Sequence, residues 1–286
     1  MLNTFYTANM TSPPTSTIGL GTWSREPGTA LVQATALPSD ATSSFVILSE
    51  THTIEVSTEW EPHSHLAHEL LWTQDGTLTA QIEGQIFTVS EGHGLWIPSG
   101  ALHGGRLTAH VELFSAFFSP ERTTTPFSTP TVIDMKPLLK SLLVHLSSRE
   151  LSQEARARAE AVVFDVLKPS AHQLALRLPD DPRIHGIANR LLANPADNRS
   201  LERWAVDAGI SSRTITRVFR EATGLSFAQW RQAVKIHRAL ELLTNGEGVQ
   251  DISEMLGYAQ PSTFIDAFRR TMGSTPGTFT LANVNR

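Results

Sequence analysis

Short apolar runs separated by Gly and Pro dominate residues 45–120. The runs include FVILSE, ELLWTQ, QIFTVS and LTAHVELFSAFF, with QDG and EG as turn signals between them. Strands this short and this evenly spaced, without an intervening helical period, predict an antiparallel β-sandwich or barrel. Residues 1–44 are rich in Thr, Ser and Pro and have little periodicity. They predict a loosely ordered arm, with a short edge strand near residues 31–37.

The hydrophobic period becomes helical after residue 132. Residues 135–146 carry one stripe of leucines, and residues 153–167 carry a second apolar stripe that ends before Pro169. Two amphipathic helices are predicted within residues 132–170. They either pack on their own β domain or form the interface of a homodimer, because an apolar stripe does not reveal what covers it. Residues 176–184, LRLPDDPRI, predict a linker, and everything after them reads as helical.

Two helix-turn-helix patterns follow the linker. In residues 201–224, apolar positions of one helix precede Gly209, which suits a left-handed turn, and Ile215 and Phe219 lie on the next helix. The pattern recurs in residues 251–273 around Gly257, where the packing pair is Phe264 and Phe268. This second pair lies one position further from its glycine, which predicts a turn one residue longer. In such motifs the second helix lies in the DNA major groove.

A single long helix is expected to connect the two motifs. Ser226 and Gln229 form a capping-box pattern at its start, and NGEG ends it near residue 243. A helix of 18 residues is about 27 Å long. It can therefore hold two recognition helices near the roughly 34 Å that separates successive major-groove entries on one face of DNA.

The residues of this half resemble the AraC/XylS-type transcription regulators. The resemblance rests on Ala205, Gly209, Ile210 and Ser211, and on the stretches IHRALELLTNG, ISEMLGY and FRRTMGSTPGTF, and it covers about residues 182–282. It implies a domain over residues 182–286 that binds a double-stranded DNA operator through both motifs.

Candidate DNA contacts are the polar residues that lie off the packing faces of the two recognition helices. We favour Arg213 and Gln260 as base readers; an arginine guanidinium can hold guanine O6 and N7. The remaining residues are candidates for base or phosphate contacts, and Arg269 and Arg270 either contact phosphates or belong to a solvated face. The set comprises Arg213, Thr214, Thr216, Arg217 and Arg220 in the first motif, and Gln260, Ser262, Thr263, Asp266, Arg269 and Arg270 in the second.

Charge and histidine are divided unevenly between the two halves. The whole chain of 286 residues has a formal charge of −5, which by itself argues against a nucleic-acid partner. Residues 1–179 carry a net charge of −7, whereas residues 180–286 carry 13 basic against 11 acidic residues, and 12 of the basic ones are Arg. Seven of the eleven histidines fall between residues 52 and 110. The halves therefore have different chemistry, and only the C-terminal half suits DNA.

The histidine-rich half contains a candidate metal site. His63, His65 and Glu69 lie close together in EWEPHSHLAHELL, and GHGLWIPSGALH supplies His103. On a strand, His63 and His65 point to one face, and a short bend can bring Glu69 to the same centre. The chain has no Cys, so a metal must use histidine and carboxylate ligands. Three imidazoles and one carboxylate leave two open positions on an octahedral divalent ion such as Mn, Fe, Co or Ni, and Zn is also possible.

These two stretches resemble the two cupin motifs, HxHxxxE with a trailing glycine and GxxxxxPxGxxH. The resemblance covers about residues 45–118, implies a cupin (jelly-roll) barrel, and assigns the metal-ligand positions to His63, His65, Glu69 and His103. Two positions depart from the cupin pattern, Ser57 in place of a glycine and Leu107 in place of an asparagine. Neither is a ligand position. Trp72 and Trp96 are expected in the core, and His68, which has the wrong strand parity, as an exposed neighbour.

We interpret the chain as a non-enzymatic, ligand-responsive transcription regulator of α+β multidomain class. A sensor domain is joined by a helical segment to a double helix-turn-helix domain, and the effector is a divalent metal or a small molecule. A cupin metalloenzyme with oxygenase or isomerase activity is one alternative, and a regulator that binds an organic effector without metal is another. No signal peptide or membrane span is apparent, so the cytoplasm is the expected compartment.

Overall fold

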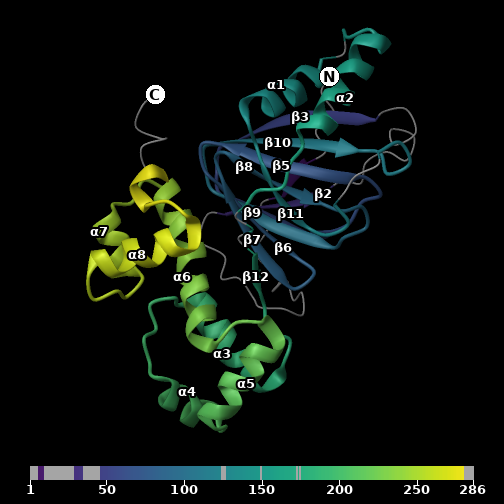
Figure 1. Ribbon diagram of the computed structural model, residues 1–286. Helices are drawn as coiled ribbons and strands as arrows, with labels where there is room; N and C mark the ends of the chain where they lie inside the picture. Colours follow the sequence, from purple (N-terminus) through teal and green to yellow (C-terminus); the bar gives the residue numbers. More distant parts are fainter. Residues whose placement is uncertain are drawn as a thin grey trace. The chain divides into compact units, whose positions relative to one another are not determined.

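In a computed structural model, the chain folds into two compact units (Figure 1). The structure describes residues 6–9, 29–34, 46–123, 127–148, 150–171, 173 and 175–279. The first unit comprises residues 1–11, 28–83 and 89–174, and the second comprises residues 12–27, 84–88 and 175–286.

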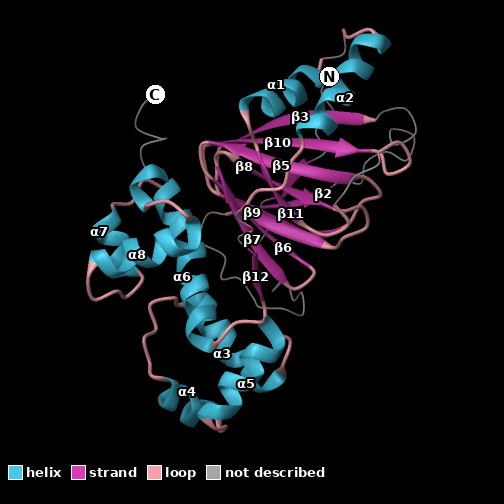
Figure 2. Cartoon of the chain, viewed as in Figure 1, coloured by secondary structure: helices cyan, strands magenta, loops and turns pink. Residues whose placement is uncertain are grey.

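Strands of the first unit form two sheets. One contains, in hydrogen-bonded order, β1 (Tyr6–Asn9), β2 (Ala30–Ala34), β4 (Thr58–His63), β9 (His103–Leu107) and β6 (Thr77–Ile82). The other contains β11 (Thr131–Asp134), β8 (His93–Ile97), β5 (His68–Gln74), β10 (Val111–Phe118) and β3 (Ile47–Ile54). Figure 2 shows these strands in magenta. The described strands thus form a two-sheet sandwich and not a closed barrel, and the fold class predicted for this half is confirmed in its sandwich form.

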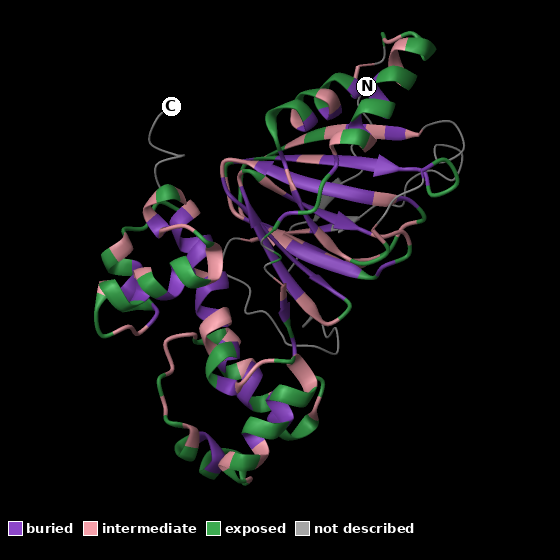
Figure 3. Cartoon of the chain, viewed as in Figure 1, coloured by how far each residue is buried: buried purple, intermediate pink, exposed green. Residues whose placement is uncertain are grey.

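Pairing in the sandwich is antiparallel except at one place. β2 runs parallel to β4, with Ala30 opposite Thr58, which the expectation of a purely antiparallel domain did not include. β1 and β2 lie within the predicted arm, and β2 overlaps the edge strand expected near residues 31–37; the remainder of that arm lies outside the described residues. Consecutive residues of β5 and β6 are buried, so both faces of these strands are covered (Figure 3).

Two helices cover the sheet that contains β5 and β8. α1 (Pro137–Leu146) and α2 (Gln153–Val166) occupy the stretches in which helices were predicted. Leu139, Leu143 and Val163 are buried in one cluster with Trp96 and Phe118 of the sheet. The apolar stripes therefore pack on their own β domain, while Leu138, Val144 and Val162 remain exposed on the outer side at 55%, 48% and 39%.

The second unit is mainly helical. Strand β12 (Ala175–Arg177) pairs antiparallel with β7 (Gln85–Ser90), so the predicted linker 176–184 contains part of a strand and the first turn of a helix. The helices are α3 (Pro182–Ala193), α4 (Leu201–Ala208), α5 (Ser212–Thr223), α6 (Phe227–Thr244), α7 (Val249–Met255) and α8 (Pro261–Met272). Trp204, Ile215, Phe219 and Trp230 form the buried centre of its first half.

Local signals set the boundaries of these helices as the sequence predicted. Ser226 accepts a hydrogen bond from the Gln229 backbone, and the Gln229 side chain accepts one from the Ser226 backbone, so α6 starts with a capping box. α4 ends at Gly209, which has the left-handed conformation (φ 66°), and α5 starts three residues after that glycine. α8 starts four residues after Gly257, which confirms the longer second turn. None of the described helices has the length and apolar character needed to cross a membrane.

Candidate functional site

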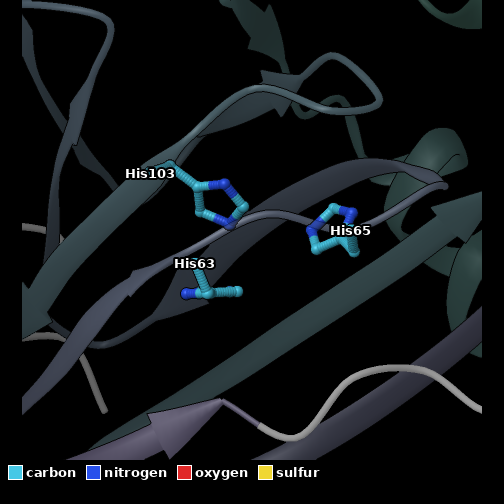
Figure 4. Close-up of side chains that lie close together, drawn as sticks. All are labelled: His63, His65 and His103. Carbon is cyan, nitrogen blue, oxygen red and sulfur yellow. The ribbon is translucent and has the colours of Figure 1, made fainter.

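Three histidines, His63, His65 and His103, lie close together (Figure 4). His63 is the last residue of β4 and lies opposite His103, the first residue of β9, in the strand ladder. His65 lies in the loop that follows β4. The ring centroids of His63 and His103 are 4.2 Å apart, those of His65 and His103 are 5.0 Å apart, and one ring nitrogen of each of the three lies within 4.8 Å of the others.

Backbone carbonyls fix how all three rings are oriented. His63 Nδ1 donates to the Glu61 carbonyl at 2.9 Å, His65 Nδ1 to the Ala67 carbonyl at 2.8 Å, and His103 Nδ1 to the Ala101 carbonyl at 2.8 Å. A carbonyl only accepts, so each Nδ1 carries hydrogen, and in a neutral ring Nε2 is then the atom with the free lone pair. Metal-binding histidines commonly have such a partner on the second nitrogen.

Glu69 supplies a carboxylate to the same cluster. It lies on β5, is buried at 2% exposure, and its Oε2 is 3.1 Å from His65 Nε2 and 3.6 Å from His103 Nε2. Burial by itself raises the pKa of Glu69, but the His103 and His65 rings beside it outweigh that effect and lower the pKa to about 2. The carboxylate is therefore charged at neutral pH.

Burial and neighbouring groups shift the pKa values of His63 and His65 in opposite directions. Burial, together with the nearby His103, lowers the pKa of His63 to about 4, so this ring is neutral at pH 7. Burial also acts to lower the pKa of His65, but the hydrogen bond and charge of Glu69 raise it overall. His103 Nε2 is buried and has no hydrogen-bond partner among the described residues. The buried carboxylate and the three rings whose Nδ1 atoms donate to carbonyls fit a divalent metal ion, which would take the place of a proton on His65.

All four residues predicted as metal ligands lie in this cluster, but the local backbone structure that places His65 there differs from the one expected. His63 and His65 were expected on one strand; instead β4 has an irregularity between Trp60 and His63 and ends there. His65 is held in the next loop, where its carbonyl accepts from the Gly100 backbone at 2.8 Å. Pro62 lacks an N–H for the ladder, which explains why pairing is interrupted at this point.

Aromatic neighbours of the site have structural roles. Trp72 and Trp96 are buried core residues, as predicted. His68, expected to be exposed, is half-buried: its ring stacks on Trp96 and its Nδ1 accepts from the Ser99 backbone at 3.0 Å. Phe117 packs edge-on against His65 with centroids 5.6 Å apart. The sequence alone does not distinguish Phe117, because one apolar strand position looks like another before the register is known.

The second unit presents the predicted DNA-contacting face on α5. Ile215, Val218 and Phe219 are buried, so Arg213 and Arg220 lie on the exposed side of the helix. Among the described residues neither arginine has an ion pair. Thr216, also exposed, donates its hydroxyl to the Ser212 carbonyl, and Arg217 pairs with Glu221 at 2.8 Å; Thr214 is half-buried beside Ser211.

On α8 the corresponding residues are likewise exposed. Phe264 and Phe268 face the core, and Arg269 pairs with Asp266 at 3.0 Å. Arg270 donates to the Asp266 carbonyl at 3.3 Å. All six residues predicted for the second motif are exposed: Gln260, Ser262, Thr263, Asp266, Arg269 and Arg270.

Comparison with known proteins identifies both units. Residues 48–176 match the model of the AraC-like ligand binding domain, and residues 204–281 match that of a helix-turn-helix domain. Over 222 residues, 76% of this chain and 81% of the relative, the chain is 32% identical to the HTH-type transcriptional regulator NimR of Escherichia coli. The chain belongs to the AraC family of transcription regulators.

Other relatives of this AraC-family regulator are also regulators. It is 30% identical to the HTH-type transcriptional regulator RipA of Corynebacterium glutamicum over 75% of the chain and 62% of RipA. Among solved structures, apo ToxT of Vibrio cholerae is aligned over 84% of this chain and 98% of ToxT, with 11% identity and a TM-score of 0.35. The N-terminal unit is a ligand-binding domain, the C-terminal unit binds DNA, and the family relationship supports a regulator and not an enzyme.

Proposed function

We propose that the ligand-binding domain of this AraC-family regulator senses a divalent metal ion, or a small molecule that it binds through such an ion. The observation that carries the proposal is the arrangement of His63, His65 and His103, whose Nδ1 atoms are all engaged by carbonyls, around the buried Glu69. These four residues would hold the ion. A bound ion would contribute positive charge beside Glu69 and open positions for an effector.

Ligand binding regulates DNA binding only if it favours one conformation over another. A ligand that binds two conformations equally shifts neither, and allosteric coupling is typically about 1 to 3 kcal/mol. A coupling of that size would change DNA affinity by roughly 5- to 150-fold.

Elemental analysis of the purified full-length protein, followed by thermal denaturation with added Mn, Fe(II), Co, Ni or Zn ions, tests this proposal. We expect one ion to co-purify or to stabilise the protein by about 2.7 kcal/mol when present at 100 times its Kd. The stabilisation should disappear in His63→Ala and His103→Ala and persist in His145→Ala, a matched control on the exposed side of α1. Operator affinity should change with the same ion.

Three outcomes would reject the metal proposal. If no ion binds, or if the wild-type and His63→Ala proteins respond identically to the effector, the domain binds an organic ligand without metal. If the protein instead turns over a substrate and metal has no effect on DNA affinity, the sensor role is wrong and a cupin metalloenzyme becomes the better interpretation.

We further propose that Arg213 and Gln260 read bases, while the neighbouring arginines contact phosphates. Arg213 is exposed and has no ion pair among the described residues, so its guanidinium is available for guanine O6 and N7. Gln260 lies at the start of α8, and residues near the start of a recognition helix are the ones that reach base edges.

The outer surface of α1 and α2 is proposed as the homodimer interface. Their inner stripes already pack on the sheet, but Leu138, Val144 and Val162 are exposed apolar side chains on the same helix pair. A second copy of the chain would cover them, which also suits an operator with paired half-sites.

A further inference from the structure

A buried lysine connects the two helix-turn-helix motifs. Lys235 is the only lysine in residues 180–286 and lies on α6 at 5% exposure. Its Nζ donates to Asn198 Oδ1 at 2.9 Å and lies 4.6 Å from the centroid of the Tyr258 ring. Among the described residues it has no carboxylate partner, and burial and the nearby Arg231 lower its pKa to about 8. A buried cation without a counter-ion is costly, which indicates a specific role.

Asn198 extends this connection to the turn of the second motif. It lies in the loop between α3 and α4, ahead of the first motif, and its Nδ2 donates to the Gly257 carbonyl. A Cβ on Gly257 would lie 2.8 Å from the Ala196 carbonyl oxygen and 2.8 Å from Asn198 Nδ2. Gly257 is therefore required by close approach of the loop as well as by its left-handed conformation (φ 69°).

Further hydrogen bonds attach the same loop to α6 and α4. The Arg231 guanidinium of α6 donates to the Arg199 carbonyl at 3.0 Å, and Arg199 in turn pairs with Asp207 of α4 at 2.5 Å. On the other side, the Gln232 side chain of α6 donates to the Tyr258 hydroxyl. Residues 196–199 thus contact the first motif, the connecting helix and the second motif at once.

We propose that Asn198, Lys235, Gly257 and Tyr258 form an inter-motif clamp that fixes the second helix-turn-helix relative to the first. The clamp sets the spacing and rotational phase at which α5 and α8 meet two successive segments of the major groove. The clamp presupposes DNA binding by both motifs. It makes that binding depend on the distance between the two DNA segments, called boxes below, that α5 and α8 contact.

The clamp has a definite effect on affinity. When two linked modules bind one ligand, the second binding event is intramolecular, and its effective concentration depends on how well the linkage matches the spacing of the sites. A rigid connection favours one spacing strongly and disfavours others. A loosened connection retains the affinity of each motif for its own box but loses part of the gain from binding both.

Fluorescence-anisotropy binding of the full-length protein to selected DNA tests the clamp. A two-box duplex is first obtained by selection from a random library with wild-type protein. Affinities are then measured for that duplex, for duplexes with two base pairs inserted between the boxes, and for duplexes in which one box is scrambled. The variants are Lys235→Met, which removes the charge, and Asn198→Asp, which keeps the acceptor for Lys235 but loses the donor to Gly257. Asn245→Ala, an exposed asparagine at the far end of α6, is the control.

The insertion should weaken wild-type and Asn245→Ala binding by about ten-fold or more. In Lys235→Met and Asn198→Asp, affinity for the uninterrupted two-box duplex should fall by about ten-fold and the penalty for the insertion should shrink to about three-fold or less, while affinity for each single box stays within about two-fold. Asn198 is exposed, so its variant serves if Lys235→Met does not fold.

Three results would overturn the clamp. One is that the insertion of two base pairs weakens DNA binding by Lys235→Met and Asn198→Asp as much as it weakens binding by the wild type. A second is an equal loss on single-box and two-box duplexes, which indicates a damaged domain. The third is a wild-type protein indifferent to the insertion, which would leave DNA binding intact but show that it does not depend on a fixed distance between motifs.

Discussion

Acid should destabilise the DNA-binding unit through one buried histidine. His237 lies on α6 at 6% exposure; its Nδ1 is hydrogen-bonded to the Thr88 hydroxyl at 2.8 Å, and its Nε2 is buried with no partner among the described residues. Burial lowers the pKa of His237 to about 4, against a smaller opposite effect from Glu241, whose carboxylate pairs with Arg238 at 2.8 Å. Between about pH 6.5 and pH 4, His237 is therefore mainly protonated in the unfolded chain but neutral in the folded chain.

The magnitude follows from these two pKa values. The contribution of His237 to the free energy of unfolding is fully present above pH 6.5 and is lost as the pH falls towards 4. The reason is that its pKa is lower in the folded chain, so protons bind the unfolded chain first and favour unfolding. Between pH 7 and pH 5 the free energy of unfolding should fall by about 2 kcal/mol from this group alone. Lys235, whose pKa burial lowers to about 8, stays mainly protonated in this interval and contributes little to the difference.

Urea denaturation at pH 7 and pH 5, followed by circular dichroism and tryptophan fluorescence, measures this effect. His237→Asn keeps a polar atom near the Nδ1 position but cannot titrate, so its loss of stability over the interval should be about 2 kcal/mol smaller than that of the wild type. The contributions of all other titrating groups are the same in the wild type and in His237→Asn, so they cancel in the difference between the two proteins. His185→Asn, at a half-buried histidine of α3, is the control for replacing a histidine by asparagine elsewhere in the same unit. If His237→Asn shows the wild-type pH dependence, the ring is hydrated or already charged in the folded protein and the reasoning is wrong.

Three further outcomes are expected. Arg213→Ala should lower discrimination at one base pair by about 1 to 3 kcal/mol in binding to a library of operator variants, and a uniform loss over all sequences would assign Arg213 to phosphate instead. Operator affinity should fall linearly on a log–log plot against salt concentration, and a phosphate-contacting arginine such as Arg270, when changed to Ala, should reduce that slope by about one. Leu138→Asp combined with Val162→Asp should convert a dimer to monomers in sedimentation equilibrium, whereas Val206→Asp, at an exposed apolar residue of α4, should not; dimers in both proteins would exclude the outer surface of α1 and α2 as the interface.

The helical half could be predicted closely because its signals are local. Capping by Ser226 and Gln229, the left-handed Gly209 and the longer turn after Gly257 involve residues only a few positions apart. Short-range hydrogen bonds and backbone conformations of this kind depend on residue type more than on the rest of the fold. The position of β12 within the expected linker escaped prediction, because Ala175–Arg177 becomes a strand only by pairing with Gln85–Phe87, about 90 residues earlier.

In the β half, the sequence indicated strands but not how they pair. A parallel contact between β2 and β4, and two sheets in place of a closed barrel, are set by pairing between distant segments. The residues of the histidine cluster were nevertheless predicted one by one, because the spacing of motif residues along the chain does not depend on how the strands pair. His65 reaches the site from a loop and not from the strand. The preset tautomers could not be predicted, since they depend on which carbonyl each ring meets.

A weakly charged DNA-binding unit explains why a fixed arrangement of two motifs matters here. Residues 180–286 carry a net charge of only +2, and Arg217 and Arg269 on the recognition helices already have carboxylate partners. Counter-ion release from few phosphates gives limited affinity, so each motif alone should bind DNA weakly. Affinity then depends on both motifs binding together, and a clamp that presents α5 and α8 at one spacing supplies part of what charge does not. Any effector signal that loosens or orders this unit would therefore act on the affinity for two boxes far more than on the affinity for one.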